Sequence, residues 1–172
     1  MINTIKTLDE RILLKIAKLQ RPYLNKIMVA TTTAGNTGTI WLLIAFPMLL
    51  NSTARNQGIK LILSLLLTGF MGEIIIKRLV GRMRPSKISE QEKLLIKKPI
   101  TYSFPSGHTS SSFAAALTIS LNYPNFAVAA FTLAGAIAFS RLYLRVHYPS
   151  DILAGAVLGI ICSLGVNAFY LS

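Results

Sequence analysis

Cysteines and acidic residues are scarce in this chain. Its 172 residues include one cysteine, Cys162, and only 6 Asp and Glu against 18 Lys and Arg. A single cysteine excludes an intrachain disulfide, and the sequence has no cluster of Asp or Cys residues of the kind that holds a metal ion. We therefore expect neither a resident metal nor another cofactor.

The shortage of acids leaves a formal net charge of +12 at pH 7. Such a charge can indicate a nucleic-acid partner when it is gathered on one soluble face. Here the basic residues lie between hydrophobic stretches, so we expect anionic lipid headgroups as the partner and no nucleic acid. Nothing in the sequence indicates a protein partner.

Hydrophobic residues make up 52% of the chain and form long runs without charge, as in integral membrane proteins. A chain in lipid satisfies its backbone hydrogen bonds inside helices or a closed barrel. We therefore predict an all-α polytopic membrane bundle of about five transmembrane helices. No repeat or linker divides the chain, so residues 1–172 are predicted to form one domain. The runs cover residues 26–50, 58–76, 109–121, 126–140 and 152–171.

Residues 1–22 carry too much charge to cross a membrane. Apolar residues recur there at helical spacing, and basic residues lie on the other faces, which predicts an amphipathic helix in the membrane interface. The helix should end before Arg21 and Pro22. Because charged and apolar residues are mixed throughout, this segment does not indicate a cleavable signal peptide. The apolar stripe is Leu8, Ile12, Ile16 and Leu19.

Three polar features interrupt the apolar runs. The small residues at 31–39, TTTAGNTGT, favour close helix packing, with substrate contact by Asn36 as the alternative. Glu73 stands four residues before Lys77, which predicts an ion pair on one helix, with proton handling as the alternative. The charged segment 86–101 contains a possible short helix around residues 88–96, and it is a second candidate for substrate contact.

The stretch 140–151, SRLYLRVHYPSD, joins two apolar helices and contains His147 and Asp151. Four residues of helix would bring these two side chains to one face. A carboxylate bonded to one ring nitrogen leaves the other nitrogen free to act as a nucleophile. The alternative is that Asp151 is a charge at a helix end and His147 a loop residue.

Topology predicts that three polar clusters meet. If one span ends at Lys77, the next begins near Thr109 and the following one ends at Ser140, then segments 77–108 and 140–151 emerge on the same face. Lys77, Arg84 and Arg141 would bind an oxyanion there, in place of a metal ion. Gly107 would admit the anion to a helix N-terminus, and Ser106 would add a hydroxyl donor. His108 would protonate the leaving oxygen while His147 attacks phosphorus.

The sequences KRLVGRMRP, PSGH and SRLYLRVHYPSD resemble, in order and spacing, the three signatures of the type 2 phosphatidic acid phosphatase (PAP2) family, which is related to vanadium haloperoxidases. The resemblance implies a metal-independent membrane phosphatase that acts on a lipid phosphate or diphosphate through a phosphohistidine. It assigns the nucleophile to His147, its orienter to Asp151 and the acid/base to His108. Phosphate binding falls to Lys77, Arg84, Ser106, Gly107 and Arg141. Many members have six spans, whereas we count five here.

The resemblance leaves the substrate and two other activities open. Undecaprenyl diphosphate, phosphatidylglycerophosphate, phosphatidic acid and lipid A are substrates of the expected kind. A lipid phosphotransferase would use the same residues, and a vanadium-dependent haloperoxidase is disfavoured by the apolar spans. Bacterial members generally act at the outer face of the cytoplasmic membrane, and we expect the same here, although the basic residues on the site face favour the cytoplasmic side by the positive-inside rule.

Overall fold

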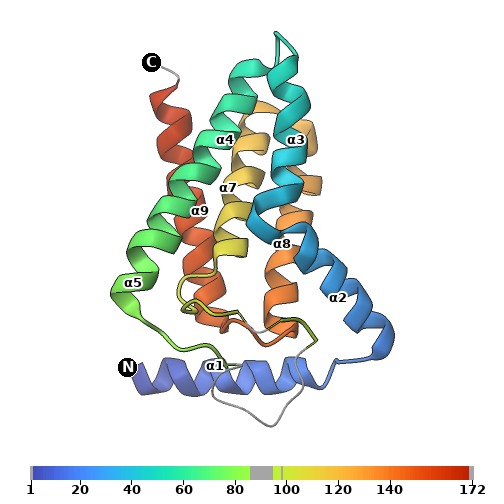
Figure 1. The fold of residues 1–172 in the computed structure, drawn as a ribbon, viewed down its shortest axis with the longest axis vertical. Helices are drawn as coiled ribbons and strands as arrows, with labels where there is room; N and C mark the ends of the chain where they lie inside the picture. The colour runs from blue at the N-terminus through green and yellow to red at the C-terminus, as the bar shows by residue number, and fades with distance from the viewer. Residues whose placement is uncertain (1, 86–94, 98, 171–172) are drawn as a thin grey trace.

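The computed structural model describes residues 2–85, 95–97 and 99–170, and these residues form a bundle of helices with no strand among them (Figure 1). The all-helical architecture predicted above is therefore observed. A helix predicted around residues 88–96 falls largely outside the described residues. The helices are α1 (Ile2–Ala17), α2 (Pro22–Ala34), α3 (Thr39–Leu50), α4 (Arg55–Gly69), α5 (Lys77–Val80), α7 (Gly107–Asn122), α8 (Ala127–Tyr143) and α9 (Pro149–Phe169).

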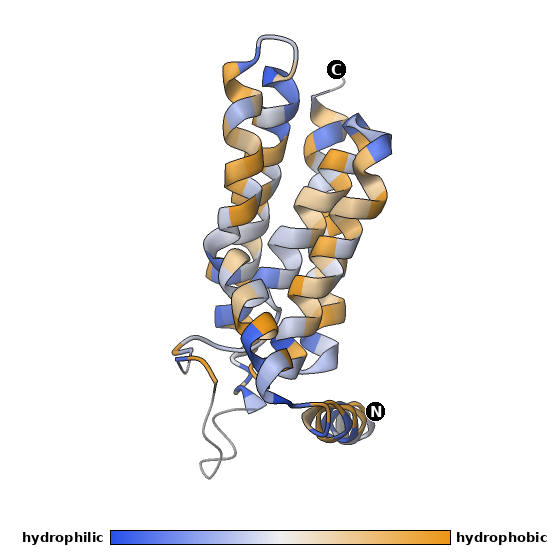
Figure 2. Ribbon diagram, turned by 90° about the vertical axis from the view of Figure 1, so that its right-hand side faces the viewer, coloured by the Kyte–Doolittle hydropathy of each residue, from blue (hydrophilic) through white to orange (hydrophobic). Residues whose placement is uncertain are grey.

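Three described helical stretches are long and apolar enough to cross a membrane, namely 55–80, 124–143 and 149–169. The pair α2 and α3 would be a fourth span if its two halves are counted together. Apolar residues are spread along these bundle helices, as Figure 2 shows. The remaining predicted span, α7, has only 16 residues and lies at the centre of the bundle against α9, α8 and α4. Because protein surrounds much of α7, it can be shorter than a helix that faces lipid.

The first predicted span is not continuous. α2 and α3 meet at a bend of 50°, separated by the short helical turn η1 (Asn36–Gly38). Thr37 and Gly38 have positive φ angles of 49° and 73°, which an α-helix cannot contain. The small and polar residues at 31–39 therefore mark a break between two helices, so the predicted run 26–50 is a bent pair of helices.

Close packing of α7 against α9 depends on two glycines of α9. A Cβ atom at Gly155 would lie 2.7 Å from the backbone oxygen of Ser106, and one at Gly159 would lie 2.2 Å from that of Ser110. Both distances are shorter than a van der Waals contact, so the two backbones can approach this closely only at glycine. This contact holds the start of α9 beside the start of α7.

We expect Gly159→Ala to destabilise the protein by about 1 to 3 kcal/mol, because the added methyl group would force the backbones of α7 and α9 apart. Gly165→Ala is the matched control, since a Cβ atom there meets nothing within 4 Å. That substitution should be neutral or stabilise the helix by up to about 1 kcal/mol. Thermal unfolding midpoints in detergent measure both changes, and equal midpoints for the two variants would contradict this account of the packing.

α1 lies across one end of the bundle, next to the end of α8 and the start of α9 (Figure 1). Its buried face includes Asp9 and Leu13, and Ile16 packs against the end of α8. Leu8 and Leu19, two members of the predicted apolar stripe, are more than half exposed. The predicted helix is observed, the interfacial position of its stripe stays a prediction, and the face that contacts the bundle contains the buried carboxylate of Asp9.

Candidate active site

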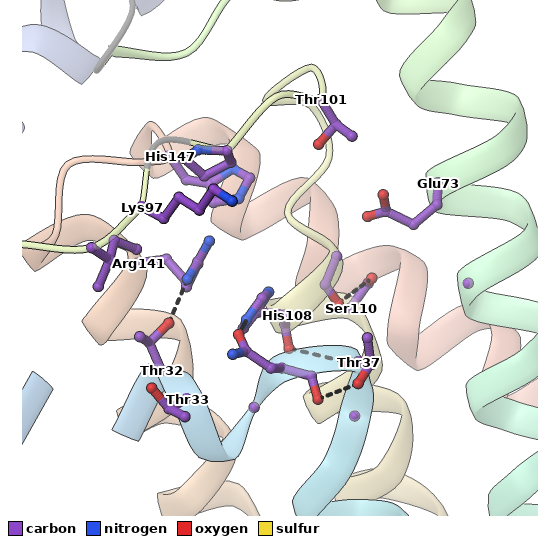
Figure 3. Close-up of a pocket in the computed structure, with 18 of the residues that line it drawn as sticks. Thr32, Thr33, Thr37, Glu73, Lys97, Thr101, His108, Ser110, Arg141 and His147 are labelled. Atoms are coloured by element: carbon purple, nitrogen blue, oxygen red, sulfur yellow. Dashed lines mark hydrogen bonds between the residues drawn. The ribbon is translucent and has the colours of Figure 1, made fainter. Parts of the chain in front are cut away.

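An open cavity of about 910 Å³ lies at the end of the bundle nearest α1. Residues from the bend between α2 and α3, from the end of α4, from the start of α7 and from the end of α8 line it. Figure 3 shows His147, Arg141 and His108 close together in this cavity, with Glu73 opposite them. Of the site residues predicted from the sequence, the cavity is lined by Lys77, Arg84, Gly107, His108, Arg141 and His147.

Three cations reach this cavity from different elements. Lys77 begins α5, which ends at Val80 and is followed by Gly81, where φ is +62°. Arg84 follows in the segment after that helix, and Arg141 lies in the last turn of α8. All three side chains are buried, yet the Nε atom of Arg141 has no hydrogen bond within the described part of the chain. A buried unpaired donor is costly, so a bound anion would stabilise this site.

The guanidinium of Arg84 is fixed by the backbone. Its Nε donates to the Thr101 carbonyl at 2.8 Å, and its Nη1 donates to the Val146 carbonyl at 2.8 Å. The same Nη1 lies 3.0 Å from Nε2 of His147. Because a guanidinium has no acceptor, Nε2 must accept this hydrogen bond, and the proton of neutral His147 is then on Nδ1. This is the tautomer that a nucleophilic Nε2 requires.

Asp151 lies on the other side of the His147 ring. Its Oδ2 is 3.5 Å from Nδ1 of His147, which is longer than a good hydrogen bond. That oxygen accepts a hydrogen bond from the backbone N–H of Tyr148 at 2.9 Å and so caps α9, whose first residue is Pro149. The predicted proximity of the two side chains is observed, and the orienting role of Asp151 stays a prediction.

His108 is in the first turn of α7, and its Nε2 lies 2.9 Å from Oδ1 of Asn36. The break between α2 and α3 brings this amide, 72 residues away in sequence, to the ring. Asn36 therefore lines the cavity and contacts a second histidine there. An amide oxygen can only accept a hydrogen bond, so Nε2 of His108 carries a proton in this contact.

Glu73 and Lys77 form the predicted ion pair, with the carboxylate and ammonium groups 2.5 Å apart. The pair lies beside Gly107, since a Cβ atom there would be 2.2 Å from the Glu73 carboxylate. An oxyanion thus already lies against the start of α7.

Ser106 differs from the prediction in its position: its hydroxyl is buried behind the cavity and accepts a hydrogen bond from the Thr109 hydroxyl at 2.9 Å. A role for Ser106 in phosphate binding stays a prediction.

Burial lowers the pKa of His147 well below its usual value, and the nearby charges of Arg84, Arg141 and Lys77 lower it further. The imidazole therefore stays neutral at a pH where a free histidine would be protonated, because its usual pKa is about 6.5. A nucleophile needs this neutral form. Activity that depends on His147 should consequently persist as the pH falls through 6.5, at about the pH where an ordinary histidine would lose it.

On the acid side of the profile, we expect kcat/KM for phosphate release to fall at a higher pH in Arg84→Gln than in the wild type, because one of the charges that lower the pKa of His147 is removed. Profiles of kcat/KM between about pH 5 and pH 8 measure this shift, and titration of the substrate cancels because both proteins receive the same lipid. Superimposable profiles would show that the Arg84 charge does not act on the nucleophile.

The PAP2 superfamily model matches residues 57–171, which include every signature stretch quoted above. The chain belongs to the PAP2 superfamily. The family resemblance inferred from the three motifs is thereby confirmed. Within the described ranges of this PAP2 chain, no group of three or more His, Cys, Asp or Glu side chains is placed to hold a metal ion.

Two proteins of this superfamily illustrate its range. The undecaprenyl-diphosphatase of Sulfolobus acidocaldarius is 31% identical over 137 residues, which cover 79% of this chain and 66% of that protein, just under two thirds of its length. The lipid A 4'-phosphatase of Bacteroides thetaiotaomicron is 26% identical over 169 residues, which cover 92% of this chain and 75% of that protein.

Two crystal structures share the fold of this PAP2 chain. Aquifex aeolicus LpxE has a TM-score of 0.81 at 26% identity, covering 94% of this chain and 95% of the other. The transmembrane PAP2 type phosphatidylglycerolphosphate phosphatase of Bacillus subtilis has a TM-score of 0.79 at 23% identity, covering 97% and 86%. The predicted membrane helix bundle is therefore confirmed, and the chain is an integral membrane protein.

Several residues at or near the site were missed by sequence reasoning. Thr32 of α2 accepts a hydrogen bond from Nη1 of Arg141, and Thr101 holds Arg84. Arg82 contacts Asp151, although it lies inside the first signature stretch and was not singled out. The sequence feature that could have identified Arg82 was its charge in an apolar chain. That feature is weak, because a basic residue at a helix end more often lies in the membrane interface without a role in the site.

Proposed function

We propose that this chain hydrolyses a lipid phosphomonoester or diphosphate through a phosphohistidine formed on His147. The observation that carries the proposal is the hydrogen bond between Arg84 and Nε2 of His147, which leaves the proton on Nδ1, in a cavity lined by three cations. A neutral imidazole beside a cluster of positive charge is a nucleophile next to an anion site.

The reaction has two steps in this proposal. The hydrogen bond from Arg84 to Nε2 of His147 breaks and Nε2 attacks phosphorus. The bond from phosphorus to the leaving oxygen breaks, and His108 gives its proton to that oxygen. Water then attacks the phosphohistidine while His108 takes a proton from it, and the phosphorus–nitrogen bond breaks to release phosphate. The charge of Lys77, Arg84 and Arg141 stabilises the transferring group in both steps.

Two features of the cavity support an anionic ligand. The unpaired Nε of Arg141 would gain a hydrogen-bond partner from a phosphoryl oxygen. The Glu73 carboxylate lies against Gly107 and Lys77, so the start of α7 accommodates an oxyanion. Apolar residues of the same cavity, among them Val29, Leu65 and Ile96, suit the alkyl part of a lipid.

The substrate belongs to the lipid phosphates, and the names of the relatives suggest three kinds: a polyprenyl diphosphate, a lipid A phosphate and phosphatidylglycerophosphate. A lipid phosphotransferase is the second candidate, because a phosphohistidine can pass its phosphoryl group to an alcohol instead of water. Only dependence on an acceptor lipid separates the two. A haloperoxidase is not favoured by relatives that are named as phosphatases.

The site is proposed to face the outside of a bacterial cytoplasmic membrane, with α1 in the interface against anionic headgroups. α1 and the cavity share one end of the bundle, whereas the loop after α3 is at the other (Figure 1). Lys6→Cys on α1 and Ser52→Cys on that loop, both in a Cys162→Ser background, test the sidedness. A membrane-impermeant maleimide should label only the α1 variant in intact cells, and the opposite labelling would place the site in the cytoplasm.

Phosphate release from detergent-purified protein tests the function. Undecaprenyl diphosphate, phosphatidylglycerophosphate and phosphatidic acid are supplied separately with EDTA, and we expect release from at least one of them without a metal. The ranking of the three lipids then identifies the substrate kind. Release only after an acceptor lipid is added would support the phosphotransferase, and release abolished by EDTA would contradict the proposed mechanism.

A further inference from the structure

Arg82 connects the surface helix α1 to the carboxylate beside His147. Its Nη1 donates to Oδ1 of Asp151 at 2.7 Å, and its Nη2 donates to Oδ2 of Asp9 at 2.7 Å. One planar guanidinium thus bridges two carboxylates that are 142 positions apart in the chain.

Both carboxylates are buried. Asp151 is 0% exposed and Asp9 is 3% exposed, although α1 lies on the surface of the bundle. Asp9 also accepts hydrogen bonds from the start of α9, at 3.0 Å from the backbone N–H of Ser150 and at 2.5 Å from its hydroxyl. Burial of a charge is costly unless it is paired and hydrogen-bonded, so this arrangement requires all of its members.

Arg82 itself is held on a third side by the ring of Tyr148, whose centroid lies 4.0 Å from its guanidinium carbon. Burial acts to lower the pKa of Arg82, but the hydrogen bonds and charges of Asp9 and Asp151 outweigh it and raise the pKa. The guanidinium is therefore a permanent charge at this place. Its Nη1 also donates to the Ser150 hydroxyl at 2.7 Å, so four neighbours determine its position.

We propose that Arg82 and Asp9 are positioning residues for the reaction, which hold Asp151, and through it His147, in the orientation that the nucleophile needs. The inference rests on the proposed function of His147. It assigns the N-terminal helix, which lies outside the three signature stretches, to the catalytic framework.

The hydrogen bonds of Asp151 explain why such support is needed. Asp151 and His147 are 3.5 Å apart, so a small rotation of the carboxylate decides whether it can accept the Nδ1 proton. Tyr148 holds one oxygen and Arg82 holds the other. Without Arg82, the salt bridge would be lost and Oδ1 of Asp151 would no longer be held by a guanidinium. A misplacement of about 1 Å in a catalytic group can cost roughly 100-fold in rate.

The test compares Arg82→Gln and Asp9→Asn with two matched controls, Arg78→Gln and Glu10→Gln. The control residues are exposed, lie close in sequence to the test residues and undergo the same chemical change. We expect kcat per folded molecule to fall about 10- to 100-fold in the two test variants and to stay at the wild-type level in the controls. KM and the inhibition constant for inorganic phosphate should change little, because the three cations of the cavity remain.

The double variant and a conservative variant separate positioning from simple stability. Because Asp9 and Arg82 act through the same carboxylate, the double variant should be no slower than Arg82→Gln alone. Arg82→Lys keeps the charge but reaches one carboxylate at a time, so its kcat should lie between those of wild type and Arg82→Gln. If the thermal midpoint and the folded fraction fall while kcat per folded molecule stays normal, the contacts are structural and the inference is wrong.

Failure of this inference differs from failure of the proposed function. If wild type releases phosphate and His147→Ala does not, but Arg82→Gln and Asp9→Asn have normal kcat, only the positioning role is removed. If wild type and His147→Ala behave alike, the proposed function itself fails. If Arg82→Gln does not fold, the positioning role is tested with Asp9→Asn and Arg82→Lys, whose kcat values are compared with those of the two control variants in the same way.

Discussion

Replacing His147 with alanine is expected to abolish phosphate release. The variant lacks the only atom proposed to bond to phosphorus, while the cations that bind the anion remain. Loss of a nucleophile that acts together with its base can cost roughly a million-fold in kcat, as is known for triads of other enzymes. Release should therefore fall to the background level of the assay. Binding of inorganic phosphate, measured by isothermal titration, should stay near that of the wild type.

The control for this experiment is the other histidine. A leaving group that needs no proton, such as 4-nitrophenolate, makes the proposed acid dispensable in the first step. His108→Ala should thus lose much less activity on 4-nitrophenyl phosphate than on a lipid phosphate, whereas His147→Ala should lose activity on both. Equal losses of both variants on both substrates would contradict the division of roles. Retained release by His147→Ala would remove the phosphohistidine from the mechanism.

Local patterns in the sequence predicted pairs of neighbouring side chains at the ends of helices. The four-residue spacings of Glu73 with Lys77 and of His147 with Asp151 each bring two side chains close together in the structure. Helical geometry makes such neighbours readable from spacing alone. The apolar runs likewise predicted the bundle, because a run without charge has few alternatives in lipid.

Contacts between distant segments could not be predicted in this way. Asn36 and His108 meet across 72 positions, and Asp9 and Arg82 across 73. The first pair depends on left-handed backbone at Thr37, a conformation that the residue type does not favour. The second depends on which face of α1 turns toward the bundle, and an apolar stripe predicts only the face for the membrane interface. Sequence periodicity reports the spacing of residues on one helix but not the partner that the helix meets.

Asp151 has both a neighbour that the sequence spacing predicts and partners from distant segments. Its spacing from His147 is local, yet both of its oxygens are bonded to groups other than the histidine. One bond caps α9 and the other reaches Arg82, which is itself fixed from α1. Asp151 is therefore both a structural residue of the helix start and the proposed orienter of the nucleophile. A substitution there must be designed so that the two roles are measured separately.

Asp151→Asn is the second variant for which we expect a large effect, a fall in kcat of roughly 1,000-fold with little change in KM. The amide keeps the size of the side chain and can still accept the Tyr148 N–H bond, but it loses the charge that stabilises an imidazolium and selects the Nδ1–H tautomer. The corresponding change in a serine-protease triad costs about 10⁴ in kcat, which sets the scale. KM should be maintained because Lys77, Arg84 and Arg141 bind the phosphate without Asp151.

Steady-state kinetics on the preferred lipid, combined with the thermal midpoint of each variant, tests this expectation. Asp151→Asn should be slower than Arg82→Gln, since it removes the orienting charge instead of its support. Adding Asp151→Asn to His147→Ala should have no further effect on rate, because the carboxylate acts only through the histidine. Normal kcat in Asp151→Asn would restrict Asp151 to capping α9. A rise in KM with unchanged kcat would instead assign it to binding, and in either case the orientation of His147 would have to come from Arg84 alone.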